Sequence, residues 1–187
     1  MPYSRYHNLF TADIIQSNAE IESLINLYHS LKPHYAHQDY NLFYLEKRQL
    51  KSENYSNKVV QKINDYGSSL GLENYVHYFL RYTEGSFTKL HRDEAVDKTI
   101  ITFVEQSPNL IGGETLFYDR YRAVEVSENH YLKTKDDTKS LDGQDIIPVI
   151  APSRTGQSVV YGREVKHGVC EVSSGYRIVL VSWFKNQ

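Results

Sequence analysis

Short apolar runs separated by turn-forming residues fill the chain from about residue 73 onward. These runs are rich in β-branched and aromatic side chains, and glycine, proline, serine and asparagine lie between them, as is typical of strands. Several short strands at this spacing favour a sandwich or barrel over alternating β-α units. The runs are NYVHYFLRY, KTIITFVE, GETLFY, DIIPVIA, QSVVYG and YRIVLVSWF.

The first third of the chain has a helical pattern instead. In NAEIESLINLYHSL, apolar residues recur at i, i+3, i+4 and i+7, with Asn18 as the expected N-cap and Pro33 as the stop. The segment SNKVVQKINDYGSSLGL repeats this pattern, and we expect Gly67 and Gly71 to mark its end. Helices followed by strands predict an α+β fold.

Length and composition limit the classes of protein to consider. The 187 residues suit one domain with a single substantial core, so we expect one domain over 1–187. The net charge of −2 does not suggest a nucleic-acid partner, and the 16 tyrosines have no basic stripe beside them for base stacking. Cys170 is the only cysteine, which excludes an intramolecular disulfide and a cysteine zinc site.

Targeting signals are not evident in the sequence. MPYSRYHNLF has no apolar segment of signal-peptide length, and no stretch approaches the length of a membrane span. We therefore expect a cytoplasmic protein without a membrane partner. The polar stretch at 127–145 is expected to be an exposed insertion between strands.

A histidine and an aspartate in FTKLHRDEAV are candidates for metal binding. An extended strand sends residues i and i+2 to the same face, so His91 and Asp93 can converge on one point. A facial iron site needs a second imidazole and leaves its other positions open for substrates. The candidate is His167, in a strand-like segment bounded by Gly162 and Gly168.

Arg177 lies ten residues after this histidine, within an apolar run. A buried charge there would be costly without a partner, and a guanidinium can bind a carboxylate through two parallel hydrogen bonds. The Ser-Ser-Gly at 173–175 predicts a turn that makes the two flanking strands antiparallel neighbours. We therefore expect His167 and Arg177 to face one cavity.

Taken together, this spacing resembles the iron(II)- and 2-oxoglutarate-dependent oxygenases, specifically their prolyl 4-hydroxylase-like branch. The family's His-x-Asp, distal His and basic residue about ten positions later match residues 91–93, His167 and Arg177. RYTEGSFTKLHRD, IGGETLFY and APSRTGQSVVYG are similar to flanking family motifs, and Tyr82 matches a tyrosine that lines the cofactor pocket. The resemblance covers roughly residues 75–185.

The resemblance implies a double-stranded β-helix, a jelly-roll or cupin-like barrel, over 73–187, braced by helices in 1–72. It implies Fe(II) at His91, Asp93 and His167, with 2-oxoglutarate and O2 as co-substrates and ascorbate as a supporting reductant. The far carboxylate of 2-oxoglutarate would pair with Arg177. Many members have a tyrosine in the strand before Gly-Gly-Glu-Thr, but KTIITFVEQ has Thr102 and Phe103 there. Tyr82 or Thr102 is therefore the expected supporting hydroxyl.

The implied reaction is hydroxylation of a C–H bond with release of succinate and CO2, because Asp93 is retained where halogenating relatives lose their carboxylate. By the branch resemblance, the expected substrate is a prolyl or other residue in a protein or peptide. A free amino acid or small metabolite is the alternative. Substrate choice is expected in loops at 34–56 and 120–145 around the barrel mouth, and the sequence does not predict the oligomeric state.

Two other hypotheses of function are a non-catalytic double-stranded β-helix that binds a ligand or partner, and a cupin-like metal enzyme that does not use 2-oxoglutarate. The intact ligand set argues against the first reading, and Arg177 at the family spacing argues against the second. Consumption of 2-oxoglutarate distinguishes both from an oxygenase.

Overall fold

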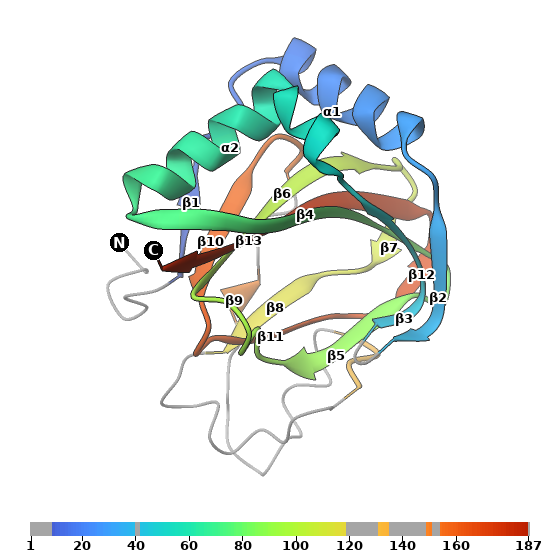
Figure 1. Ribbon diagram of the computed structural model, residues 1–187. Coiled ribbons are helices and arrows are strands. Elements are labelled where there is room, and N and C mark those ends of the chain that lie inside the picture. Colours follow the sequence, from blue (N-terminus) through green and yellow to red (C-terminus); the bar gives the residue numbers. More distant parts are fainter. Residues whose placement is uncertain (1–8, 40–41, 119–130, 135–148, 151–153, 187) are drawn as a thin grey trace.

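The computed structural model describes residues 9–39, 42–118, 131–134, 149–150 and 154–186, and has a curled antiparallel sheet with helices along one side (Figure 1). The strands are β1 Leu9–Ala12, β2 His34–Asp39, β3 Leu42–Gln49, β4 Leu72–Thr83, β5 Phe87–His91, β6 Lys98–Gln106, β7 Ile111–Gly112, β8 Thr115–Tyr118, β9 Val149–Ile150, β10 Ser158–Gly162, β11 Lys166–Val169, β12 Val172–Ser174 and β13 Tyr176–Asn186. The helices are α1 Asn18–Ser30, the short 3-10 helix η2 Ser52–Ser56 and α2 Lys58–Ser69.

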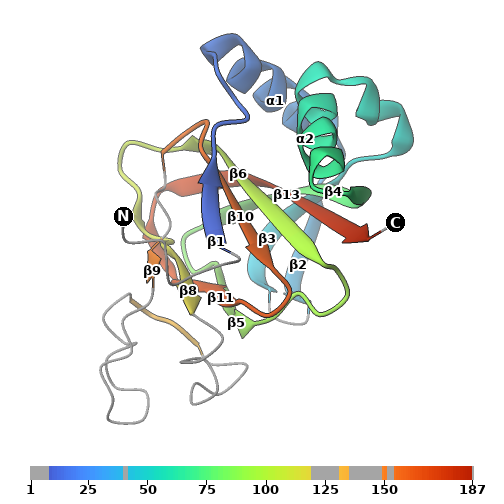
Figure 2. The ribbon, with the colours of Figure 1, turned by 90° about the vertical axis from the view of Figure 1, so that its left-hand side faces the viewer.

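The strands form two facing sheets joined through β3. The large sheet has the order β1-β10-β6-β13-β4, and the small sheet has the order β5-β11-β8-β9. One end of β3 pairs with β5 and the other end pairs with β4, so the chain of hydrogen-bonded strands turns the corner at β3. The two sheets enclose an interior, and the fold is the expected α+β double-stranded β-helix (Figures 1 and 2).

Alternation along the large sheet divides its side chains between two cores. Ile100 and Val104 of β6 pack in the cluster that includes both long helices, which cover the outer face of this sheet (Figure 2). Ile101 and Phe103 belong to the second cluster, between the sheets. Because successive side chains of a strand point to opposite faces, a shift of one residue decides whether a side chain can reach the barrel interior.

The first long helix begins one residue earlier than its apolar pattern suggests. Ser17, and not Asn18, is the N-cap of α1. The Ser17 hydroxyl accepts a hydrogen bond from the Glu20 amide at 3.3 Å, and the Glu20 carboxylate accepts one from the Ser17 amide at 3.2 Å. This reciprocal capping box satisfies two amides at once, which explains why serine is preferred over the following asparagine.

Gly67 does not mark the end of the second long helix but lies within α2. A Cβ atom at this position would come within 2.2 Å of the Phe184 ring, so the missing side chain lets α2 pack closely on β13. Gly71 does follow the helix end, where its φ of +78° suits glycine.

The prediction that residues 1–72 are a helical support is wrong for part of that segment. Residues 34–39 and 42–49 form the paired strands β2 and β3, and β3 extends the sheet beside β4 and β5. The segment 34–56, expected to be a loop at the barrel mouth, therefore contributes strands and η2. Of the insertion expected at 120–145, only 131–134 lies within the described residues.

The expected pairing between the strands of His167 and Arg177 is also wrong. β11 pairs with β5 and β8 in the small sheet, whereas β13 pairs with β4 and β6 in the large sheet. Between them in sequence, β12 pairs with the short strand β7, and Gly175 makes the turn with a φ of +78°. The two residues are thus on facing sheets. No helix among the described residues is long and apolar enough to cross a membrane.

Candidate metal and cofactor site

Two histidines come from paired strands of the small sheet. His91 at the end of β5 lies directly opposite His167 on β11, and their ring centroids are 4.3 Å apart. His91 pairs with His167, and Thr88 pairs with Val169. One residue separates the two paired positions on β11 but two separate them on β5, so β5 contains a bulge. A bulge of this kind changes the face to which the following side chains point.

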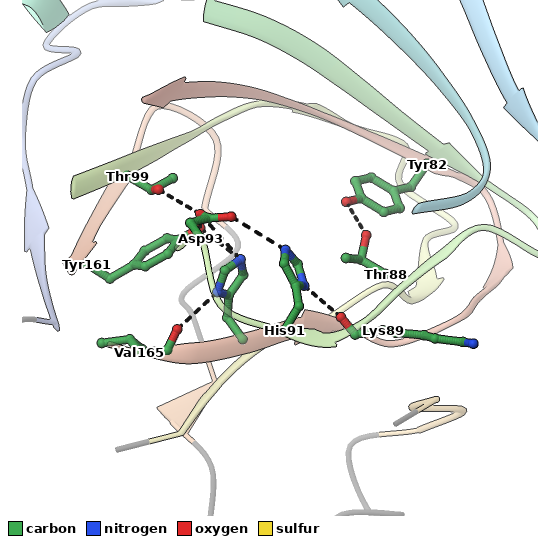
Figure 3. Close-up of polar contacts among 9 residues, drawn as sticks. Tyr82, Thr88, Lys89, His91, Asp93, Thr99, Tyr161 and Val165 are labelled. Carbon is green, nitrogen blue, oxygen red and sulfur yellow. Dashed lines mark hydrogen bonds and ion pairs between the residues drawn. The ribbon is translucent and has the colours of Figure 1, made fainter. Parts of the chain in front are cut away.

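Asp93 completes a cluster with these imidazoles. Asp93 lies two residues beyond the end of β5, and it is buried, with 8% of its surface exposed. The ligand atoms of His91, Asp93 and His167 all lie within 4.8 Å of one another. His91 Nε2 is 3.5 Å from Asp93 Oδ1, and His167 Nε2 is 3.7 Å from Asp93 Oδ2 (Figure 3). Two imidazoles and one carboxylate form the facial set that binds non-haem Fe(II) and leaves positions open.

Backbone carbonyls orient both rings toward the centre of this cluster. His91 Nδ1 lies 2.8 Å from the carbonyl of Lys89, and His167 Nδ1 lies 3.2 Å from that of Val165 (Figure 3). Since only a protonated nitrogen can donate to a carbonyl, each Nδ1 carries a proton, and Nε2 is the atom of each ring that faces the cluster and can bind a metal. Hydrogen bonds of this kind fix the tautomer and orientation of metal-binding histidines.

The electrostatic environment favours the metal-binding protonation states. Burial lowers the pKa of His167 to about 4, so this imidazole is neutral at pH 7. Burial alone would raise the pKa of Asp93, but the His167 and His91 rings and the Thr99 hydroxyl hold it well below its usual range. Metal ligands must be deprotonated, and the site presents an ionised carboxylate and a neutral imidazole without metal.

A buried guanidinium lies at another part of the same interior. Arg177 is 2% exposed, donates from NH2 to the Thr115 hydroxyl at 2.8 Å, and donates from NH1 to the Gly113 carbonyl. Its Nε has no hydrogen-bond partner, and none of the described carboxylates forms an ion pair with it. A buried cation without a counterion is costly, so this group is suited to an anionic ligand.

Tyr82 connects the arginine to the strand of the first histidine. It lies opposite Arg177 across β4 and β13, and its ring centroid is 4.8 Å from the guanidinium carbon. Its hydroxyl shares a hydrogen bond of 2.8 Å with Thr88 on β5, three residues before His91 (Figure 3). The arginine and the metal cluster are therefore parts of one interior, between the two sheets.

Thr102 is not brought to this site. Its hydroxyl shares a hydrogen bond of 2.8 Å with Ser158, and its neighbours at i−2 and i+2, Ile100 and Val104, pack in the cluster that includes the helices. A hydroxyl that does contact Arg177 is that of Thr115. This residue is the threonine of the Gly-Gly-Glu-Thr motif, so the signal for it was present in the sequence.

Two more hydroxyls at the metal cluster were not expected from the sequence. Thr99 donates to Asp93 Oδ2 at 2.7 Å, and Tyr161 donates to the same oxygen at 3.0 Å. Burial and the neighbouring Asp93 raise the pKa of the Tyr161 phenol well above its ordinary value, so it keeps its proton. Thr99 alternates with Ile101 and Phe103, and this periodicity places it on the interior face.

Comparison with known proteins identifies the fold. No family model and no curated protein matches the chain. Among solved structures, a Pseudomonas putida prolyl-4-hydroxylase has a TM-score of 0.62 at 16% identity, over 97% of this chain and 94% of that one. A 2OG-Fe(II) oxygenase family oxidoreductase from Burkholderia pseudomallei has a TM-score of 0.66 at 14% identity, over 100% and 89%. HygX from Streptomyces hygroscopicus, with nickel, 2-oxoglutarate and hygromycin B bound, has a TM-score of 0.67 at 11% identity, over 100% and 85%.

The chain therefore has the fold of the 2OG-Fe(II) oxygenases over nearly its full length. At these low identities the likeness defines the fold alone. The chemistry has to be argued from this chain's own residues, and its His-Asp-His cluster fits an Fe(II) ion.

Proposed function

We propose that the protein is an Fe(II)- and 2-oxoglutarate-dependent dioxygenase that hydroxylates a C–H bond. The observation that carries this proposal is the pairing of two features in one interior. His91, Asp93 and His167 form a facial ligand set, and Arg177 is a buried cation with no carboxylate partner among the described residues. A metal site alone fits many enzymes, but a buried guanidinium in the same barrel suits a dicarboxylate that reaches from the metal to the arginine.

Each of these residues has a separate task in the proposed reaction. The two histidines and Asp93 would hold the metal, and Arg177 would bind the far carboxylate of 2-oxoglutarate, with Thr115 and Gly113 fixing the guanidinium. When bound, iron and 2-oxoglutarate supply the activation of O2, with succinate and CO2 released. The protein contributes orientation and a largely apolar interior that excludes water.

The oxygenase proposal is tested by product formation without any knowledge of the substrate. Such oxygenases are expected to convert some 2-oxoglutarate to succinate slowly even without substrate. Succinate that depends on Fe(II) and O2, and that is lost in Asp93→Ala, would support the proposal. Metal binding without any succinate would instead favour a binding module or a cupin-like enzyme of another kind.

The proposed substrate is a prolyl residue in a protein or peptide. This rests on the motif resemblance and on the likeness to a solved prolyl-4-hydroxylase. A small molecule is the alternative, since the similar HygX structure holds hygromycin B.

Proline-containing peptides and free amino acids can be compared as stimulants of succinate release. We expect a peptide, and not free proline, to accelerate the release and to gain the mass of one oxygen atom. Stimulation by a free amino acid alone would support the small-molecule alternative.

A further inference from the structure

We infer that Tyr161 and Thr99 act together as positioning residues that leave Asp93 only one oxygen, Oδ1, for the metal. Both hydroxyls donate to Oδ2, Thr99 at 2.7 Å and Tyr161 at 3.0 Å. Each carboxylate oxygen lies near one proposed ligand nitrogen, Oδ1 at 3.5 Å from His91 Nε2 and Oδ2 at 3.7 Å from His167 Nε2, so the two hydroxyls on Oδ2 are what distinguishes the oxygens. This inference rests on the proposed metal site and adds to it the way in which the carboxylate binds.

A carboxylate can bind a metal through one oxygen or through both. Two donors on the same oxygen occupy its lone pairs, and a metal would have to displace them to bind it. Asp93 is therefore held for binding through Oδ1 alone. This matters for an oxygenase, because a second carboxylate oxygen on the metal would occupy a position that its co-substrates need.

The two hydroxyls come from paired positions on the large sheet. Tyr161 on β10 lies directly opposite Thr99 on β6, and both reach across the interior to Asp93, which follows a strand of the small sheet. Tyr161 is 1% exposed, and its ring packs 4.6 Å from that of His167 and 5.1 Å from that of Phe117. The phenol is thus fixed in place by packing, and the pair links the two sheets at the metal site.

Tyr161 also contacts the second histidine. Its hydroxyl is 3.1 Å from His167 Nε2, so one proton faces two acceptors in the protein without metal. A metal bound to His167 Nε2 would use the lone pair of that nitrogen, and the Tyr161 hydroxyl would then donate to Asp93 Oδ2 alone. Tyr161 therefore holds two ligands close together before the metal arrives and continues to hold the carboxylate afterwards.

The test is metal binding by variants that lose one hydroxyl but keep their shape. In Tyr161→Phe and Thr99→Val we expect the affinity for Co(II), measured by competition with a chelator, to fall about 10- to 100-fold, as is typical when a group that orients a metal ligand is removed. The visible spectrum of bound Co(II) should change as well, because a released Oδ2 can enter the coordination shell. Tyr28→Phe, which removes an equally buried phenol hydroxyl beside the helices, should match the wild type in both measurements.

The outcomes separate this inference from the function on which it rests. Wild-type protein that binds no Co(II) contradicts the metal site itself, and the inference with it. Wild-type protein that binds Co(II), with both variants matching it in affinity and spectrum, contradicts only the positioning role. Thr99→Val decides the question by itself if Tyr161→Phe does not fold, because both hydroxyls hold the same oxygen.

Discussion

At the scale of single residues, the charge of Arg177 is buried, and no carboxylate among the described residues forms an ion pair with it. Its NH1 and NH2 groups each donate to this chain, to Gly113 and Thr115, and its Nε has no partner. The guanidinium is therefore fixed in orientation while part of its hydrogen-bonding capacity is unused. The Tyr82 ring below it adds a cation-π contact at 4.8 Å.

Replacing this arginine should separate co-substrate binding from metal binding. In Arg177→Gln we expect 2-oxoglutarate affinity for the metal-loaded protein to fall at least about 30-fold, which is the loss of about 2 kcal/mol expected when a buried charge pair is broken. Metal affinity should stay close to that of the wild type. Calorimetric titration with 2-oxoglutarate measures the first and chelator competition measures the second.

The control is Arg163→Gln, the same change at an arginine whose side chain is 58% exposed. It should leave both affinities unchanged. Unaltered 2-oxoglutarate affinity in Arg177→Gln would show that the co-substrate does not bind this guanidinium.

Some of these residues could be predicted from the sequence, for a physical reason. His91 and Asp93 are close in the chain, so a short extended segment is enough to bring them together. Thr102 was a wrong choice because one step along a strand reverses the direction of the side chain. Tyr161 could not be found, because its contact with Asp93 depends on which strands pair and in which register.

At the scale of elements, a buried histidine joins helix α2 to the large sheet. His77 on β4 shares hydrogen bonds with Asn64 Oδ1 of α2 at 2.9 Å and with Ser182 Oγ of β13 at 2.8 Å. The amide oxygen can only accept, so Nε2 donates to it, and in the neutral ring Nδ1 then accepts from the serine hydroxyl. This arrangement needs a neutral ring, and Tyr55 and Phe184 pack edge-on against it.

This histidine should make the stability of the fold depend on pH. Burial lowers the pKa of His77 to about 4, below its usual value near 6.5, so the unfolded chain takes up a proton first as the pH falls. Its contribution is complete above pH 6.5 and is lost between about pH 6.5 and 4. The difference in pKa corresponds to about 3 kcal/mol of unfolding free energy.

Urea unfolding of the metal-free protein at several pH values measures this effect. His77→Gln should lose about 3 kcal/mol less stability than the wild type between pH 7 and 4, because it lacks this titrating ring. The buried His167, whose pKa is also lowered, is present in both proteins, and its contribution cancels. Identical pH profiles for the two proteins would contradict the buried neutral state of His77.

Elements differ in how well the sequence predicts them. Strands β6, β10 and β13 match the expected runs to within two residues at their ends, because each run is apolar and bounded by turn residues. The paired strands β2 and β3 were missed, since HYAHQDYNLFYLEKRQ has no clean alternation and β3 forms where β4 and β5 supply partners. The wrong pairing of β11 with β13 has a similar cause, because β12 and its pairing with β7 are not evident locally.

At the scale of the whole molecule, the two sheets, their interior and the helices form a continuous structure. The large sheet lies between two cores, with Ile178 and Leu180 of β13 on the helix side and Val179 and Val181 on the barrel side. Loss of either core would expose one face of the same strands. We therefore propose that residues 1–187 fold as one domain.

Cooperative unfolding tests this proposal. Trp183 is the only tryptophan and packs against the interior cluster, so its fluorescence reports on the barrel interior. Far-ultraviolet circular dichroism reports on the backbone, including the helices. We expect the two urea transitions of the metal-free protein to coincide, as in two-state unfolding. Separate midpoints would show that the helical layer and the barrel unfold independently.

The most direct test of the proposed function is an anaerobic titration of the metal-free protein with Fe(II) and then 2-oxoglutarate. Chelation of Fe(II) by 2-oxoglutarate gives a visible metal-to-ligand charge-transfer band, and no substrate is needed to see it. We expect the band in the wild type and in His34→Ala, a change at an exposed histidine, but not in His91→Ala or His167→Ala with circular dichroism preserved. Bound Fe(II) without the band, or a band that persists in both of the latter variants, would contradict the proposed site.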